Sequence, residues 1–181
     1  MLILVVGPSG AGKDTLIDGA RTRLAADPRY RFVTRDITRP REAGGEDHNP
    51  VTPGVFAARR AAGHYALAWE AHGLGYGIPA DIADDLARGH CVIANVSRAV
   101  LTDAAARFPT RILEITAPVE TLARRLAARG RETEADIAAR LSRAVPLPAG
   151  LDIARIDNTG AIEDSIEAVL AVLAAGLTPP A

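Results

Sequence analysis

The stretch Gly7-Pro8-Ser9-Gly10-Ala11-Gly12-Lys13 decides how the rest of this sequence is interpreted. It matches G-x-x-x-x-G-K, a phosphate-binding loop in which glycines allow backbone N–H groups to point at phosphate. Lys13 is the one lysine among 21 Lys and Arg residues. A tightly wrapped loop has room for the compact charge of a lysine but not for a planar guanidinium, which explains why this position differs from the others.

The residues on either side of this loop have the pattern that the motif requires. The apolar run Leu2-Ile3-Leu4-Val5-Val6 precedes it and predicts a buried strand. Leu16, Ile17, Ala20 and Leu24 follow it at helical spacing. A strand, a loop and a helix in that order place the dipole of the helix N-terminus against the phosphates. We therefore favour a nucleoside triphosphate site over a simple glycine-rich turn.

Composition narrows the class of protein. A length of 181 residues suits one domain, and 48% apolar residues suit a globular core. The net charge of −1 argues against nucleic-acid and membrane partners, and no apolar run approaches the ~20 residues of a membrane span. The N-terminal run lacks a positive leader, and Cys91 lies in an apolar run as a buried hydrophobe. We expect a soluble cytoplasmic protein.

Strand-like and helical patterns alternate along the chain. Strands are predicted at 2–6, 31–34, 65–69, 91–96, 111–116 and 153–157. Helices are predicted at about 13–26, 53–62, 79–88, 98–107, 118–129, 133–144 and 161–175. This alternation predicts an α/β fold with a parallel sheet flanked by helices, whose ligands lie at the carboxyl ends of the strands.

Two stretches interrupt the alternation. Residues 36–54 are rich in Pro and Gly with little periodicity, and a loop of that length in a compact domain is usually functional. Residues 124–143 hold six arginines, most of which we expect on a solvated face. Residues 178–181 predict a frayed tail.

Four motifs in order resemble the guanylate kinase family over nearly the whole chain. They are the phosphate-binding loop, Thr38-Arg39-Pro40-Arg41 with Gly45-Glu46, Gly75-Tyr76-Gly77, and Arg129-Gly130-Arg131-Glu132-Thr133-Glu134 with Arg140-Leu141. The resemblance implies a single P-loop domain at 1–177. Its core would be 1–33, 80–123 and 146–177, with an acceptor-binding subdomain at about 34–79 and a helical lid at about 124–145.

The departures from that family concern recognition of the guanine base. The Ser or Thr after the loop lysine is Asp14 here, followed by Thr15. Where the family has a Glu before the Trp of the third strand, this chain has Ala68. Where the family ends a strand with Asp-x-Asp, this chain has Ala-Asn-Val-Ser at 94–97, and the family's Asp-Tyr pair is replaced by Asp47-His48. A site that loses its polar partners loses orders of magnitude in discrimination. Guanine recognition is therefore expected to be absent.

A branch of the family, the ribose 1,5-bisphosphate phosphokinases of phosphonate catabolism, resembles the chain more fully. The shared runs include Gly-Pro-Ser-Gly-Ala-Gly-Lys-Asp-Thr, 35–40, 44–48, 69–74, 76–79 and 95–98. The resemblance implies transfer of the ATP γ-phosphoryl group to ribose 1,5-bisphosphate, giving 5-phosphoribosyl 1-diphosphate. It also accounts for Asp14 and for the runs around His48 and His72.

On the donor side, phosphoryl transfer requires positioning and charge neutralisation. Gly7, Pro8, Ser9, Gly10, Ala11, Gly12, Lys13, Asp14 and Thr15 are the predicted ATP-binding residues. Lys13 is expected at the β- and γ-phosphates, and Asp14 supplies an oxygen ligand for Mg²⁺. The alternative for Asp14 is a helix N-terminal carboxylate worth about 0.3–1 kcal/mol. The resemblance makes Arg129 and Arg140 catalytic lid residues. It also places a loop after Asp157-Asn158 against adenine through backbone contacts.

On the acceptor side, phosphate needs fixed cations, and bidentate arginine suits it. The predicted acceptor-binding residues are Arg35, Arg39, Arg41, His48, Glu70, His72, Tyr76 and Arg98. A substrate with two phosphates needs more cation than a nucleoside monophosphate, which is the argument for Arg98. Arg98 in solvent at a helix start and His72 in a solvated loop remain open alternatives.

Two other functions compete with a sugar-bisphosphate kinase. A guanylate kinase with unusual base contacts is opposed by Ala68 and the missing Asp-x-Asp. A non-catalytic guanylate-kinase-like interaction module usually lacks the loop lysine and the lid arginines, whereas this chain has both.

Overall fold

The core is a five-stranded sheet whose strands are all parallel. The computed structural model describes residues 1–40, 47–128 and 146–177. The strand order is β2 (Tyr30–Phe32), β7 (Cys91–Asn95), β1 (Leu2–Val6), β8 (Thr110–Thr116) and β9 (Ile153–Asp157). The predicted α/β class with a parallel sheet is confirmed. β1 lies in the centre, so the loop that follows it opens at the middle of the sheet's carboxyl edge.

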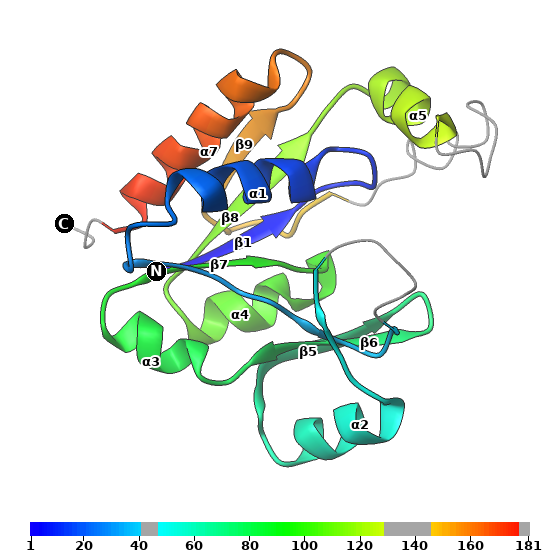
Figure 1. Cartoon of the computed structure of the whole chain (residues 1–181), viewed down its shortest axis with the longest axis vertical. Helices are drawn as coiled ribbons and strands as arrows, with labels where there is room; N and C mark the ends of the chain where they lie inside the picture. The colour runs from blue at the N-terminus through cyan, green and yellow to red at the C-terminus, as the bar shows by residue number, and fades with distance from the viewer. Residues whose placement is uncertain (41–46, 129–145, 178–181) are drawn as a thin grey trace.

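Alternating residues of β1 build a core on each face of the sheet. Ile3 and Val5 pack toward α1 (Lys13–Arg23) and α7 (Ile162–Ala175). Leu4 and Val6 pack on the other face, together with residues of α3 (Ile82–Ala87) and α4 (Leu101–Arg107). Figure 1 shows the two helical layers on opposite sides of the sheet. Burial on both faces explains why the strand is apolar without alternation.

A second sheet projects from the carboxyl side of the core. Its order is β4 (Asn49–Pro50), β3 (Asp36–Ile37), β6 (Leu74–Pro79) and β5 (Tyr65–Ala71), and β5 and β6 form an antiparallel hairpin. α2 (Pro53–Ala61) covers one face of this sheet and is capped at its N-terminus by Thr52, whose side chain accepts from Val55 N. The other face of the hairpin carries Trp69 into the core beneath β1.

The structure corrects several predicted element boundaries. β6 was missed, because two glycines within 74–79 hide its alternation, so α3 begins at 82 rather than 79. The predicted loop at 36–54 contains β3, β4 and the start of α2. The predicted helix at 98–107 opens with a 3₁₀ turn, η2 (Arg98–Val100). The predicted helix at 118–129 corresponds to α5 (Val119–Ala127), and the predicted helix at 133–144 lies outside the described residues.

Two expectations from composition can be compared with the described residues. Among the described residues, no helix combines the length and apolarity needed to cross a bilayer. Cys91 is fully buried, and this burial raises the pKa of its thiol to about 11. A thiol that stays protonated is a poor nucleophile, so the prediction of a small buried hydrophobe is confirmed.

We expect Leu4→Ala to lower the free energy of unfolding by about 2–5 kcal/mol, because it opens a cavity in the fully buried centre of the sheet. Urea denaturation followed by circular dichroism measures the loss. Val55→Ala is the matched control, since its side chain is 42% exposed and its loss should stay within about 0.5 kcal/mol. Equal losses in the two variants would contradict the assignment of the core.

Candidate active site

The loop between β1 and α1 has the geometry of a phosphate cradle. Gly7 passes so close to β8 that a Cβ atom would lie 2.0 Å from the Ile115 carbonyl oxygen. Gly12 has φ +87°, a left-handed conformation that favours glycine, and α1 begins at the next residue. The motif glycines are therefore required by the path of the backbone, as the sequence predicted. Pro8, Ser9, Gly10 and Ala11 form the turn between them.

Lys13 folds back over this loop. Its Nζ donates to the carbonyl oxygens of Gly7 and Pro8, at 2.9 and 3.1 Å. These contacts hold the ammonium group at the mouth of the loop, where the phosphates of a nucleotide would arrive. Asp14 and Thr15 follow in the first turn of α1, and both are exposed.

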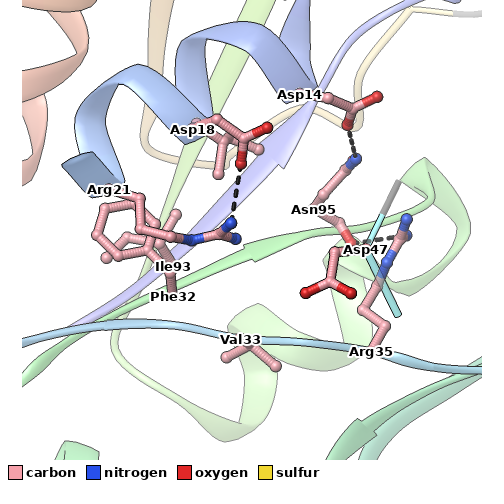
Figure 2. A pocket seen from close by; sticks show the side chains of 10 residues that line it. Asp14, Asp18, Arg21, Phe32, Val33, Arg35, Asp47, Ile93 and Asn95 are labelled. Carbon is pink, nitrogen blue, oxygen red and sulfur yellow. Dashed lines mark hydrogen bonds and ion pairs between the residues drawn. The ribbon is translucent and has the colours of Figure 1, made fainter. Parts of the chain in front are cut away.

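One residue at the end of β7 connects the loop helix to the second sheet. Asn95 Nδ2 donates to Asp14 Oδ1 at 3.1 Å, and the Asn95 carbonyl oxygen accepts from Arg35 Nη1 at 2.8 Å. Figure 2 shows the three side chains around a small cavity of about 50 Å³, which Asp47 also borders. The predicted donor residue Asp14 and the predicted acceptor residue Arg35 are thus brought together.

The Asp14 carboxylate suits a hydrated cation better than a caged one. Its side chain is exposed, and one of its oxygens is already bonded to Asn95. Among residues 1–40, 47–128 and 146–177, no group of three or more His, Cys, Asp or Glu side chains gathers around a common point. Mg²⁺ in phosphoryl-transfer sites keeps several waters and takes one or two carboxylates plus substrate phosphates. The residues present fit that arrangement.

Arg35 is a buried cation that lies against two aromatic rings. It is only 7% exposed, and its guanidinium carbon lies 5.7 Å from the Trp69 ring centroid and 5.4 Å from that of Tyr76. The two rings stack at 5.3 Å with an interplanar angle of 3°. Cation–π contacts and the Asn95 carbonyl offset the cost of burying this charge.

Arg39 presents donors without partners. Its Nε and Nη2 atoms are buried and have no hydrogen-bond partner in the part of the chain that the structure describes. Two neighbouring N–H donors on one edge of a guanidinium match two oxygens of a phosphate. His48, which is 3% exposed, holds the Arg39 backbone through a 2.9 Å contact between Nε2 and the carbonyl oxygen. His48 therefore holds the backbone of Arg39 in place while the guanidinium remains available.

Glu70 and His72 are not brought to this group. Glu70 pairs across the hairpin with Gly75, on the α2 face, and its carboxylate reaches Arg60 at 3.4 Å. His72 and Gly73 form the two-residue turn of the hairpin with φ of 53° and 74°. Such values are those of a type I′ turn, in which His is one of the tolerated residues. His72 is exposed, which matches the alternative of a solvated loop histidine.

Arg98 lies on the side of the sheet occupied by the hairpin. Its Nη2 is 3.6 Å from Glu114 Oε1, and Glu114 also accepts from Arg155 at 2.8 Å. The Glu114 side chain is only 15% exposed. The pairing places Arg98 near the end of β1 rather than freely in solvent, because Glu114 is in register with Val6. Arg41, Arg129 and Arg140 lie outside the described residues.

Sequence reasoning missed two residues that brace the loop. Asn158 is 5% exposed, and its Nδ2 donates to the Ala11 carbonyl oxygen at 2.8 Å. Arg125, expected on a solvated face, instead donates to the carbonyl oxygens of Asn158 at 2.9 Å and Gly10 at 3.4 Å. Its position three residues after buried Leu122 was the available signal, because that spacing puts both on one helix face.

A larger cavity of about 550 Å³ adjoins this brace. It is lined by Thr121, Arg124, Arg125, Ala128 and Thr159. Arg125 both lines this cavity and contacts the loop, so the cavity lies beside the residue that braces the phosphate cradle.

Comparisons with known proteins place the chain in a family. A family model described as an AAA domain matches residues 2–145. Ribose 1,5-bisphosphate phosphokinase PhnN of Rhizobium etli is 46% identical over 175 residues, covering 96% of this chain and 89% of the relative. The Methylobacterium radiotolerans protein of that name is 50% identical over 177 residues, covering 96% and 97%. The chain belongs to the ribose 1,5-bisphosphate phosphokinase family. Its resemblance to that family is confirmed.

A solved structure shows the same fold at low identity. Guanylate kinase from Anaplasma phagocytophilum superposes with a TM-score of 0.65 at 19% identity, covering 98% of this chain and 86% of that one. This likeness confirms the guanylate-kinase-like P-loop fold. At 19% identity this likeness shows the fold alone and does not indicate the acceptor.

The buried carboxylate of Asp36 stabilises the β5–β6 hairpin through hydrogen bonds to Tyr65 and Arg59. Asp36 Oδ2 accepts from Tyr65 Oη at 2.8 Å and from Arg59 Nη1 at 2.6 Å. Gly75 and Gly77 leave room for the Phe56 and Tyr65 rings, which would lie 2.7 and 2.4 Å from added Cβ atoms. Burial, and then the hydrogen bond to Asp36, raise the pKa of Tyr65 to about 12.

This pKa shift predicts a loss of stability in alkali. Because the folded pKa lies above the ordinary value of about 10, the phenol contributes fully below pH 10, and that contribution disappears as pH rises through 12. We expect the free energy of unfolding to fall more steeply between pH 10 and 12 in the native protein than in Tyr65→Phe. Urea titrations across that range measure both slopes, and parallel curves would refute the coupling.

Proposed function

We propose that this chain is an ATP-dependent kinase that phosphorylates ribose 1,5-bisphosphate to give 5-phosphoribosyl 1-diphosphate. The observation that carries the proposal is the pair of hydrogen bonds that link Asp14 to Asn95 and Asn95 to Arg35. These bonds join the phosphate-binding loop to a buried cation on the proposed acceptor side. Relatives named for this activity match nearly the whole chain. The finer assignments, to phosphonate catabolism and to the cytoplasm, are part of the proposal.

The identity of the product fixes which bond forms. The diphosphate of the product is on C1, so an oxygen of the C1 phosphate attacks the γ-phosphorus of ATP while the bond to the β-phosphate oxygen breaks and ADP leaves. The C5 phosphate is unchanged. A phosphate acceptor is already ionised near neutral pH, so the step needs no strong general base. Catalysis then depends on positioning and on neutralising charge.

On the donor side, residues 7–15 would hold the triphosphate. Backbone N–H groups of the loop would surround the phosphates, Lys13 would neutralise the β and γ oxygens, and Thr15 would reach the α-phosphate. Mg²⁺, held through Asp14, would neutralise charge on the β and γ oxygens when bound. Arg129 and Arg140 are proposed to close over ATP and exclude water, within a lid at about 124–145.

On the acceptor side, the subdomain at about 34–79 would hold the sugar bisphosphate. Arg39 and Arg35 are proposed to bind the reacting phosphate, with Arg41 and the Tyr76 hydroxyl as further donors. Arg98 is proposed for the second phosphate, because Glu114 holds it near the carboxyl edge of the sheet. Ala68 pairs with Gly77, so the position carries no polar group for a base edge.

The proposal is tested by a coupled ADP-release assay with ATP and Mg²⁺, offering ribose 1,5-bisphosphate and GMP in parallel. We expect turnover with the sugar bisphosphate, and phosphorus NMR should show a C1 diphosphate. Turnover with GMP alone would make the chain a guanylate kinase with atypical base contacts. ATP binding without turnover of either acceptor would contradict both kinase assignments.

Arg39→Lys should raise the KM for the acceptor about 10–100-fold with little effect on the KM for ATP, since a lysine cannot replace two parallel N–H donors. Steady-state kinetics with each substrate varied in turn measures the effect. Arg111→Lys is the control, because that arginine pairs with Asp152 at the other end of β8. An unchanged acceptor KM in Arg39→Lys would remove Arg39 from the acceptor site.

Asp14→Asn should raise the Mg²⁺ concentration for half-maximal rate about tenfold, because the carboxylate charge is lost while the shape is kept. Asp18→Asn, one turn later on α1 and paired with Arg21, should leave the Mg²⁺ requirement unchanged. If Asp14→Asn shifts only the free energy of unfolding, by about 0.3–1 kcal/mol, its role is to stabilise the helix N-terminus.

A further inference from the structure

The chain segment after β9 returns to the phosphate-binding loop. Asn158 follows the strand directly, and its backbone N–H donates to the Thr116 carbonyl oxygen at 2.8 Å. This bond anchors Asn158 to the end of β8. Its side-chain amide then reaches Ala11, whose carbonyl accepts from Nδ2 at 2.8 Å. Both residues are buried, Ala11 completely and Asn158 to 5% exposure.

The Ala11 carbonyl matters because of the peptide it belongs to. In a trans peptide the C=O and the N–H point in opposite directions. Fixing the Ala11 carbonyl on Asn158 therefore fixes the direction of the Gly12 N–H, which belongs to the same peptide. A phosphate cradle depends on the direction of such N–H groups. Without the amide donor, the buried carbonyl would lose its partner, and the peptide would be free to rotate.

Gly12 is matched to this contact. A Cβ atom on residue 12 would lie 2.4 Å from Asn158 Nδ2. The absence of a side chain therefore has a second cause beyond its φ of +87°, since the amide occupies that space. Arg125 completes the brace, because its guanidinium binds the Asn158 carbonyl oxygen at 2.9 Å. Asn158 is therefore held at three points: its backbone N–H by β8, its backbone carbonyl by α5, and its side-chain amide by the loop itself.

We propose that Asn158 is a positioning residue for the phosphate donor, which acts by fixing the peptide between Ala11 and Gly12. It acts on the triphosphate through the loop and makes no contribution through the nucleoside. The inference rests on the proposed use of this loop to bind ATP. It requires no particular acceptor.

The test compares two ligands of the whole protein. Both ATP and inorganic tripolyphosphate fit the phosphate cradle, but only ATP has a nucleoside. We expect Asn158→Ala to weaken both ligands by a similar factor of about ten in isothermal titration calorimetry with Mg²⁺ present. In steady-state kinetics the KM for ATP should rise and kcat should fall, while the KM for the acceptor stays within twofold.

Two variants control for folding and for general destabilisation. Asn158→Leu keeps the branched shape of the side chain without its donor and leaves no cavity, so it should show the same losses even if the alanine variant folds poorly. Arg31→Ala breaks a partly buried ion pair with Asp85 and Asp81, away from the loop. It should lower the melting temperature and leave both affinities unchanged.

Three results would overturn the proposal. Weaker ATP binding with unchanged tripolyphosphate binding would mean that the side chain acts on the nucleoside. Unchanged affinity for both ligands would mean that the loop holds its shape without the amide. Equal losses in Arg31→Ala would reduce the effect to general instability. The two calorimetric affinities do not involve the sugar bisphosphate, so a wrong acceptor in the proposed function would leave this part of the test intact.

Discussion

The close approach of Gly7 to β8 is the constraint on which the site depends. The backbone leaves β1 directly under the Ile115 carbonyl, where no side chain fits, and turns at once toward α1. This turn places Lys13 and Asp14 at the carboxyl edge of the sheet, beside the ends of β7 and β8. In parallel α/β sheets that edge is where connecting loops converge and ligands bind. The tight turn thus sets the location of Lys13 and Asp14.

The acceptor side depends on how one buried cation is compensated. A buried charge is costly unless it is paired or bonded. Arg35 donates a hydrogen bond to the backbone carbonyl of Asn95 and makes cation–π contacts with the rings of Trp69 and Tyr76. The rings can lie there because the opposite face of the hairpin has glycines, against which α2 and Tyr65 pack. The Gly75-Tyr76-Gly77 motif therefore allows close packing on both faces of the hairpin.

Two departures from guanylate kinases prove to be in contact. Asp14 stands where those enzymes have a hydroxyl, and Asn95 ends the strand where they have acids. In this structure the Asn95 amide donates to the Asp14 carboxylate. A carboxylate at position 95 would repel the Asp14 carboxylate, whereas the Asn95 amide donates a hydrogen bond to it.

The phosphate-binding loop and the alternation of core strands and helices could be predicted from the amino-acid sequence alone. Both follow from spacing within a few residues, because the motif and the periodicity are local. The three-dimensional fold was needed to show that β6 pairs with β5, that Glu70 faces α2, and that Asn158 and Arg125 brace the loop. These contacts join segments far apart along the chain, and they depend on register and on the return path of the backbone, which no local pattern records.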